Sequence, residues 1–332
     1  MLTTEKGDES RRIVGIGSAL VDILVHEDDE FLEKATALKG GMTYVEDEFI
    51  EQVMTQANGK LHVVPGGSAC NTIIGVGKLG GAARFVGKLG EDKMGKLFEK
   101  DLRNNNVEPM LFTSSSPTGR VLSIITPDAQ RSMLTYLGAS AETHVNEITE
   151  KCFQNTAIVH IEGYLLFNKD VMLAALNAAK RAGTRVSLDL ASFTVVESSK
   201  DFLETLVDDF VDILIANEDE ARAFTGYADE TDALGALSEK AEIAVLKVGE
   251  RGSFISREGN VTAVEPKGGE TADVVDTTGA GDLWASGFLF GLANDYPIDK
   301  CGELGSMCGY EVCRVMGANI PEAGWKRIRK LL

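Results

Sequence analysis

Apolar positions along the chain follow two patterns that alternate. Short apolar runs predict buried strands, and they lie at 13–19, 157–161, 185–190, 211–216 and 243–248. Segments with apolar residues at helical spacing predict helices, and they lie at 46–57, 92–104, 168–182, 200–209 and 304–316. Strands that alternate with helices indicate βαβ units, which form a mostly parallel sheet with helices on both faces.

The region 107–137 departs from this pattern. Its apolar runs are short, at 110–112, 121–126 and 133–136, and turn-forming residues separate them, which predicts hairpin strands. Residues 1–11 are polar and predict a flexible N-terminus. No repeat or Pro/Gly/Ser-rich linker divides 12–330, so we expect a single α/β domain there.

Composition excludes several classes of protein. Of the 332 residues, 44% are hydrophobic and 25% are charged, which is typical of a soluble globular protein. The net charge of −18 argues against nucleic acid or an anionic membrane surface as a partner. No apolar run is long enough to cross a membrane, and the N-terminus has no secretory pattern. The five cysteines are scattered without a CxxC pair, which predicts reduced thiols and a cytoplasmic protein.

The segment 274–289, VVDTTGAGDLWASGFL, carries the strongest chemical signal. It predicts a strand, a tight loop of small residues and the start of a helix. The loop consists of small residues, Gly279, Ala280 and Gly281, whose side chains do not shield the backbone N–H groups. Such N–H groups at the start of a helix favour binding of an anion. Asp282 is unfavourable beside a phosphate unless it accepts a proton from an attacking hydroxyl. The alternative is an ordinary strand-to-helix turn with Asp282 in the first helical turn.

A second glycine-rich segment runs from Pro65 to Thr72. Gly66 and Gly67 allow close backbone approach to a ligand, Ser68 is expected to cap the following helix, and Asn71 then faces the ligand. The alternative is a turn with a capping serine and no ligand. Asp22 is an acid within an apolar run, which is costly to bury without a partner. It either faces water at a strand end or binds a ligand.

Two segments resemble nucleotide-binding motifs, but each lacks a residue that its motif requires. Gly15 and Gly17 suggest a dinucleotide fingerprint, but Leu20 stands where the third glycine belongs. The run from Gly90 to Lys96 has P-loop spacing, but Leu97 replaces the Ser or Thr that would bind magnesium.

Polar residues also follow two later strands. Asn217 and Glu220 come directly after the strand at 211–216, and ligands of α/β sheets bind beyond such strand ends. Acids at this place have two possible roles. They bind Mg²⁺, directly or through water, or they stabilise the start of a helix. Lys247, Gly249 and Gly252 follow the strand at 243–248. Arg131 stands at a predicted hairpin, where it either contacts substrate or phosphate or is exposed to solvent.

These segments resemble the signatures of the PfkB, or ribokinase-like, family of sugar and nucleoside kinases. Asp276, Thr277, Gly279 to Asp282 and Gly287 match D-T-x-G-A-G-D and its helix, Gly66 to Asn71 match G-G-x-x-x-N, and Asn217 with Glu220 match N-x-x-E. The resemblance covers about 12–322. It implies a three-layer α/β/α fold with a small β-sheet lid built from about 20–46 and 107–137.

The resemblance also implies ATP-dependent phosphorylation of a primary hydroxyl. Asp282 is expected to be the base, and the N–H groups of Gly279, Ala280 and Gly281 are expected to stabilise the charge of the transferred phosphoryl group. The acceptor is expected to contact Asp22, Gly66, Gly67, Ser68, Asn71 and Arg131. The nucleotide is expected to contact Asn217, Lys247, Gly249, Gly252 and Thr277, and Mg²⁺ to lie near Glu220 and Asn217, held through water. Lys247 occupies a position where the family commonly has threonine, so this chain has a positive charge there in place of the hydroxyl.

The acceptor is predicted to be adenosine or a related nucleoside, because GGSACNT and the LVDI around Asp22 resemble the adenosine-kinase form of the motifs. The alternatives are a small sugar such as ribose or fructose, and a non-catalytic regulator that binds such a ligand. Side-chain identity leaves open whether K⁺ is required and whether the protein is a monomer or a homodimer.

Overall fold

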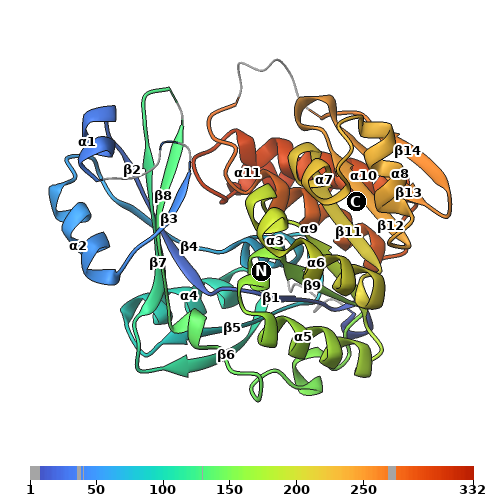
Figure 1. Ribbon diagram of the computed structural model, residues 1–332, viewed down its shortest axis with the longest axis horizontal. Coiled ribbons are helices and arrows are strands. Elements are labelled where there is room, and N and C mark those ends of the chain that lie inside the picture. The colour runs from blue at the N-terminus through green and yellow to red at the C-terminus, as the bar shows by residue number, and fades with distance from the viewer. Residues whose placement is uncertain (1–7, 36–38, 40, 129, 268–273) are drawn as a thin grey trace.

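The computed structural model describes residues 8–35, 39, 41–128, 130–267 and 274–332, which form two β-sheets with helices around them (Figure 1). The large sheet has nine strands in the order β14-β13-β12-β11-β10-β9-β1-β5-β6. Its pairs are parallel except at one edge, where β12, β13 and β14 are antiparallel. The strands are β1 Ile13–Ile16, β5 Ala83–Gly90, β6 Val107–Ser114, β9 Ile158–Glu162, β10 Arg185–Asp189, β11 Ile213–Asn217, β12 Ile243–Lys247, β13 Ser253–Arg257 and β14 Asn260–Val264.

Helices cover both faces of this sheet because its strands are apolar on both faces. On one face pack α3 Ser68–Lys78, α4 Lys93–Asn104, α9 Ala280–Ala293, α10 Ile298–Cys313 and α11 Glu322–Ile328. On the other pack α5 Lys169–Arg181, α6 Phe193–Phe210, α7 Glu218–Thr225 and α8 Glu230–Ser238. Shorter 3-10 turns occur at η2 Ala139–Glu142, η3 Glu150–Phe153, η4 Gly163–Phe167 and η5 Gly249–Arg251. The three-layer α/β/α arrangement predicted from the alternating pattern is therefore confirmed.

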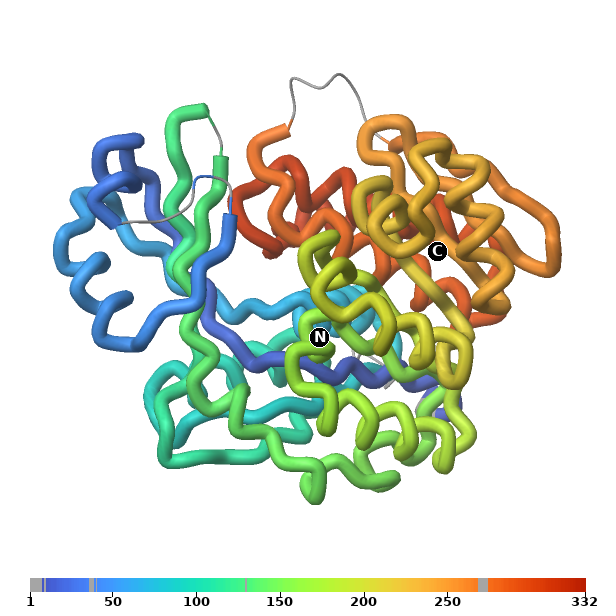
Figure 2. The backbone as a smooth tube through the Cα atoms, in the orientation of Figure 1, coloured from blue at the N-terminus to red at the C-terminus, as the bar shows by residue number. Residues whose placement is uncertain are grey.

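The small sheet has five strands in the order β3-β8-β7-β2-β4 and lies beside the large sheet (Figure 1). Its strands are β2 Leu20–His26, β3 Met42–Tyr44, β4 His62–Gly66, β7 Thr118–Ile125 and β8 Arg131–Gly138. Alternate residues such as Ile23 and Leu122 pack under α1 Asp29–Lys34 and α2 Asp47–Gln56, whereas Asp22 and Val121 face a cavity. We call this sheet with α1 and α2 the lid. The chain passes from the large sheet to the lid in the short crossover between β1 and β2 (Figure 2).

Several sequence predictions need correction. Residues 107–114 form β6, which pairs with β5 at the edge of the large sheet and is not part of the lid. The lid instead includes β4, which we did not predict. The first strand ends at Ile16 because the chain turns there toward the lid. Val274 and Val275 do not form a strand among the described residues; both side chains are exposed, although the Val275 N–H donates to the Cys313 carbonyl.

Other predictions stand. The helices expected at 46–57, 92–104 and 168–182 are α2, α4 and α5, and Asn168 caps α5 as expected. Part of the predicted flexible N-terminus, residues 1–7, lies outside the described residues. All five cysteines are free, and no helix in the described ranges is long and apolar enough to cross a membrane.

Candidate active site

A cavity of about 850 Å³ lies between the lid and the ends of the large-sheet strands. Strands β9, β10, β11 and β12 all end at this cavity, as expected for a ligand site of an α/β sheet. The predicted site residues that line it are Asp22, Gly67, Ser68, Asn71, Arg131, Asn217, Glu220, Lys247, Thr277, Gly279, Ala280, Gly281 and Asp282. Asp22 and Asp282, which are 260 positions apart in the chain, therefore meet in one cavity.

Asp282 lies in the first turn of α9 and is held by two side chains from α3. The Ser68 hydroxyl donates to Oδ1 at 2.7 Å, and the Asn71 amide donates to Oδ2 at 2.9 Å. Burial raises the pKa of Asp282, while the hydrogen bonds from Asn71 and Ser68 lower it. The result is a fixed carboxylate whose basicity exceeds that of a solvated aspartate, which suits a general base.

The loop before α9 has a geometry that depends on glycine. Gly279 is the N-cap, with φ of 73°, and a Cβ there would lie 2.6 Å from the Cβ of Ala318. The Asp276 carboxylate fixes the loop by accepting from the Thr278 N–H at 2.9 Å and the Gly317 N–H at 2.8 Å. The Ala280 N–H donates to the Thr277 carbonyl at 3.1 Å, so the first turn of α9 contributes its N–H groups mainly from Gly281 onward.

Ser68 has a different role from the one predicted. The N-cap of α3 is Gly67, and Ser68 is the first helical residue, so its hydroxyl is available to Asp282. Gly67 has φ of 96°, and a Cβ on it would lie 2.4 Å from the Ser18 carbonyl oxygen. Gly66 does not line the cavity, but a Cβ on it would lie 2.4 Å from the Asp22 carboxylate. Both glycines therefore let backbone pack closely around the site.

Asp22 and Arg131 reach the cavity from the lid. Burial raises the pKa of Asp22 to about 6, Arg131 lowers it and Asp282 raises it further. Arg131 Nη1 donates to the Thr278 hydroxyl at 2.6 Å, so this arginine joins the lid to the loop before α9. The lid arginine therefore lies at the site, and solvent alone does not account for its position.

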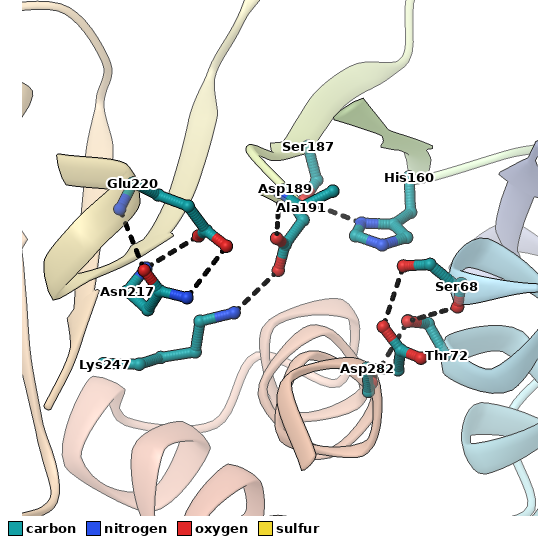
Figure 3. A network of polar contacts seen from close by, with 10 residues as sticks. All are labelled: Ser68, Thr72, His160, Ser187, Asp189, Ala191, Asn217, Glu220, Lys247 and Asp282. Carbon is teal, nitrogen blue, oxygen red and sulfur yellow. Dashed lines mark hydrogen bonds and ion pairs between the residues drawn. The ribbon is translucent and has the colours of Figure 1, made fainter. Parts of the chain in front are cut away.

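Asn217 and Glu220 form a capping box at the start of α7 (Figure 3). Glu220 N–H donates to Asn217 Oδ1 at 2.9 Å, and the two Glu220 oxygens accept from the Asn217 N–H and Nδ2, each at 2.8 Å. Burial raises the pKa of Glu220, Asp189 raises it further, and Lys247 opposes the shift. Both residues line the cavity, so the structural role as a cap does not remove them from reach of a ligand.

Lys247 lies between two acids, as Figure 3 shows. Its ammonium donates to Asp189 Oδ2 at 2.9 Å, and a Cβ on Gly281 would lie 3.1 Å from Nζ. Burial lowers the pKa of Lys247, but Asp189 and Glu220 together outweigh it and raise the pKa. The lysine therefore holds a positive charge beside the start of α9, where the helix dipole also favours an anion.

The residues around Glu220 suit Mg²⁺ held through water rather than a closed metal cage. No cluster of three or more His, Cys, Asp or Glu side chains in the described ranges could hold a metal by itself. Mg²⁺ keeps several waters and takes its remaining ligands from one or two carboxylates and from substrate phosphates. Glu220 and Asn217 would hold it, and when bound it would neutralise phosphate charge.

Gly249 and Gly252 lie away from this cavity. They flank the turn between β12 and β13, with φ of 56° and 95°, and a Cβ on Gly252 would lie 2.1 Å from the Val264 carbonyl oxygen. The positive φ values explain why these positions need glycine. Their predicted contact with the nucleotide stays a prediction.

Sequence reasoning missed several residues that line the site. Asp189 is buried and pairs with Lys247, and Glu162 is 1% exposed and accepts from two backbone N–H groups. Each stands at the end of a predicted strand, and that position was an available signal. Tyr44 also lines the cavity and packs edge to face against Phe167, and the sequence around Tyr44 does not indicate this contact.

Comparison with known proteins agrees with this geometry. The family model described as pfkB family carbohydrate kinase matches residues 42–323. The chain belongs to the pfkB family of carbohydrate kinases. The predicted family, fold and enzyme class are thereby confirmed, and the protein is a phosphotransferase. A kinase of this family uses ATP with Mg²⁺ and acts on a small-molecule acceptor.

The similar proteins divide between two kinds of acceptor. A 5-dehydro-2-deoxygluconokinase of Geobacillus kaustophilus is 31% identical over 264 residues, which cover 73% of this chain and 76% of the relative. The solved adenosine kinase of Sinorhizobium meliloti is 31% identical, with a TM-score of 0.89, and the match covers 99% of this chain and 100% of that one. A probable sugar kinase of Rhizobium etli also has a TM-score of 0.89, at 29% identity, with 97% and 99% covered.

Proposed function

We propose that this pfkB kinase transfers the γ-phosphoryl group of ATP to a primary hydroxyl of a nucleoside such as adenosine. The observation that carries the reaction is the position of Asp282, a carboxylate fixed by Ser68 and Asn71 at the start of α9 inside the cavity. A base in that place can take the proton of an acceptor hydroxyl as the hydroxyl attacks phosphorus.

The charges at the α9 end support the phosphate half of this proposal. The start of α9 stabilises negative charge, with backbone N–H groups contributed mainly from Gly281 onward because the Ala280 N–H already donates to the Thr277 carbonyl. Lys247, beside Gly281, adds a fixed cation and contacts the nucleotide phosphates, as does Thr277. Mg²⁺ near Glu220 and Asn217 would offset the remaining charge.

The lid side of the cavity supports a nucleoside as acceptor. Tyr44 on β3 and Phe167 on η4 meet edge to face, with ring centroids 6.1 Å apart and an interplanar angle of 89°. Both side chains line the cavity and are about half exposed, at 47% and 51%. Other residues with largely apolar side chains that line the same cavity include Met42, Met133, Leu137, Tyr164 and Leu165. An aromatic and apolar wall of this kind suits a base, because stacking on aromatic rings adds to the binding energy.

A small sugar is the second candidate, because the polar side of the same cavity suits hydroxyl groups. Asp22 and Asn71 provide an acceptor and an amide for such hydroxyls. The relative from Geobacillus kaustophilus, named as a kinase of a sugar derivative, also favours it.

An ATP-consumption screen separates the two acceptors. Adenosine, other nucleosides, ribose and fructose are each supplied with Mg-ATP, with and without K⁺. We expect kcat/KM to be highest for a nucleoside. A clear preference for a sugar over every nucleoside would contradict the nucleoside assignment, and equal rates with Na⁺ would show that K⁺ is not required.

We further propose that the protein is cytoplasmic and is a monomer or a homodimer. The five free cysteines support a reducing location. Light scattering of the purified chain at assay concentration decides the oligomeric state.

A further inference from the structure

Glu162, at the end of β9, lies at the junction of three segments that meet behind the acceptor site. Its Oε1 accepts from the Ser18 N–H at 2.8 Å, and its Oε2 accepts from the Ala69 N–H at 2.8 Å. Ser18 belongs to the crossover from the large sheet to the lid, and Ala69 to the first turn of α3. One carboxylate therefore ties the sheet, the crossover and the helix together.

The surroundings fit this side chain closely. Glu162 is 1% exposed, and a Cβ on Gly17 would lie within 2.4 Å of the carboxylate carbon. The Ser18 carbonyl in turn lies against Gly67, the N-cap of α3. This packing holds the Glu162 carboxylate in place. A negative charge is favourable there because the carboxylate lies at the start of α3.

The segment that Glu162 holds, the first turn of α3, also contacts Asp282, the proposed base. Ser68 and Asn71 flank Ala69 on the same helical turn, and both donate to Asp282. A shift of the first turn of α3 would therefore move both donors relative to the carboxylate that they hold. Misplacement of reacting groups by about 1 Å can lower a rate by about 100-fold.

We propose that Glu162 is a positioning residue: by bridging Ser18 and Ala69 it sets α3, and through α3 it orients Asp282 for proton transfer. The inference rests on the proposed role of Asp282 as the base. The bridge needs both oxygens as acceptors, so it needs the ionised carboxylate. A protonated acid or an amide puts a donor against one of the two N–H groups and loses that bond.

The bridge should therefore depend on pH in the neutral range. Burial raises the pKa of Glu162 to about 7, the N–H groups of Ala69 and Ser18 oppose this shift, and Asp282 of α9 adds to it. The other titratable groups that face the Glu162 carboxylate are Tyr44 of β3, Tyr164 of η4 and Cys70 of α3. The bridge is present above this pKa and is lost as the pH falls through it.

Glu162→Gln tests the proposal, with Glu311→Gln as the matched control. Glu311 is also 1% exposed, but it pairs with Arg327 between α10 and α11. With Mg-ATP and either adenosine or fructose as acceptor, folded E162Q should lose at least about 10-fold in kcat with little change in the KM for ATP. Its kcat should also lose the rise near pH 7 that the wild type shows. E311Q should lower the melting temperature but keep the wild-type pH profile.

Hydrogen exchange at residues 18 and 69 gives a readout that needs no acceptor. Both amides should exchange faster in E162Q than in the wild type, and equally fast in E311Q and the wild type. Unchanged exchange, or a kcat and pH profile like those of the wild type, would overturn the proposal.

Gly17→Ala provides a second variant if E162Q does not fold. The added Cβ displaces the carboxylate from the Ser18 and Ala69 N–H groups, so kcat should fall and should lose its rise near neutral pH; an unchanged kcat and pH profile would contradict the inference. Asp282→Asn distinguishes the hypothesis that Asp282 is the base from the hypothesis that Glu162 positions it. If D282N is active, the base assignment fails; if D282N is inactive but E162Q is normal, only the role of Glu162 fails.

Discussion

The two ends of the cavity are built in different ways. The phosphate end, around α9, uses backbone N–H groups, one loop of consecutive residues and the Lys247–Asp189 pair. The acceptor end uses side chains from the lid and from η4 that are far apart in the chain, among them Tyr44 and Phe167. In the function that we propose, the first end binds the triphosphate tail of the nucleotide, whereas the second end selects the hydroxyl compound that is phosphorylated. Chemistry and specificity therefore lie on separate elements and should respond to separate substitutions.

The largest effect is expected at the phosphate end, from Asp282→Asn. The amide cannot take a proton, so kcat should fall by about 10²–10⁴-fold while the KM for ATP and the fold change little. Steady-state kinetics and circular dichroism measure this. A near-normal kcat would refute the role of Asp282 as a base.

Lys247→Met should have the next largest effect. Loss of the cation beside Gly281 removes charge stabilisation from the phosphates and leaves Asp189 without its partner, so kcat should fall by about 10²-fold. Lys240→Met is the matched control, because Lys240 pairs with Asp208 on the surface. Equal kinetics for the two variants would show that Lys247 has no part in the reaction.

At the acceptor end, Phe167→Ala should raise the KM for adenosine by about 10-fold and leave the KM for ATP within about 2-fold. The reason is that the substitution removes one ring of the pair with Tyr44, worth about 1 kcal/mol beyond simple burial. Phe193→Ala is the control, because Phe193 is exposed to a similar extent at the start of α6. A rise in the KM for ATP alone would show that the two ends are not separate.

The last effect concerns stability and not catalysis, because the acceptor end holds two acids with raised pKa values, Asp22 at about 6 and Glu162 at about 7. At pH values between the ordinary pKa values of these two side chains and their raised values, the folded state binds more protons than the unfolded chain does. The stability that protonation provides is complete below about pH 4 and is lost as the pH rises through 6 and 7. For Glu162 the loss is on the order of 3 kcal/mol, and E162Q should show less of it in urea unfolding between pH 5 and 8. A wild-type stability that rises over this range would contradict these directions.

The same contrast explains what the sequence could and could not predict. Asn217 and Glu220 contact each other within one turn of α7, so their spacing alone predicts how they lie. The capping role of Ser68 was a wrong prediction because Gly67 takes that position, and the hydroxyl then reaches an acid 214 residues away. Strand β6 has the same short apolar pattern as β7, but only pairing in the folded chain decides which sheet each strand joins. The strand-end positions of Asp189 and Glu162 indicate that they lie near the site, but no local pattern encodes their partners or the contact of Tyr44 across segments.

A crystal structure with Mg²⁺, a non-hydrolysable ATP analogue and adenosine tests the central claim most directly. We predict that the γ-phosphate lies against the start of α9 at residues 279–281. We also predict that an adenosine hydroxyl lies within hydrogen-bond reach of the Asp282 carboxylate, about 2.6–3.2 Å away. A triphosphate tail bound far from residues 279–282, or an acceptor with no hydroxyl near Asp282, would contradict the account.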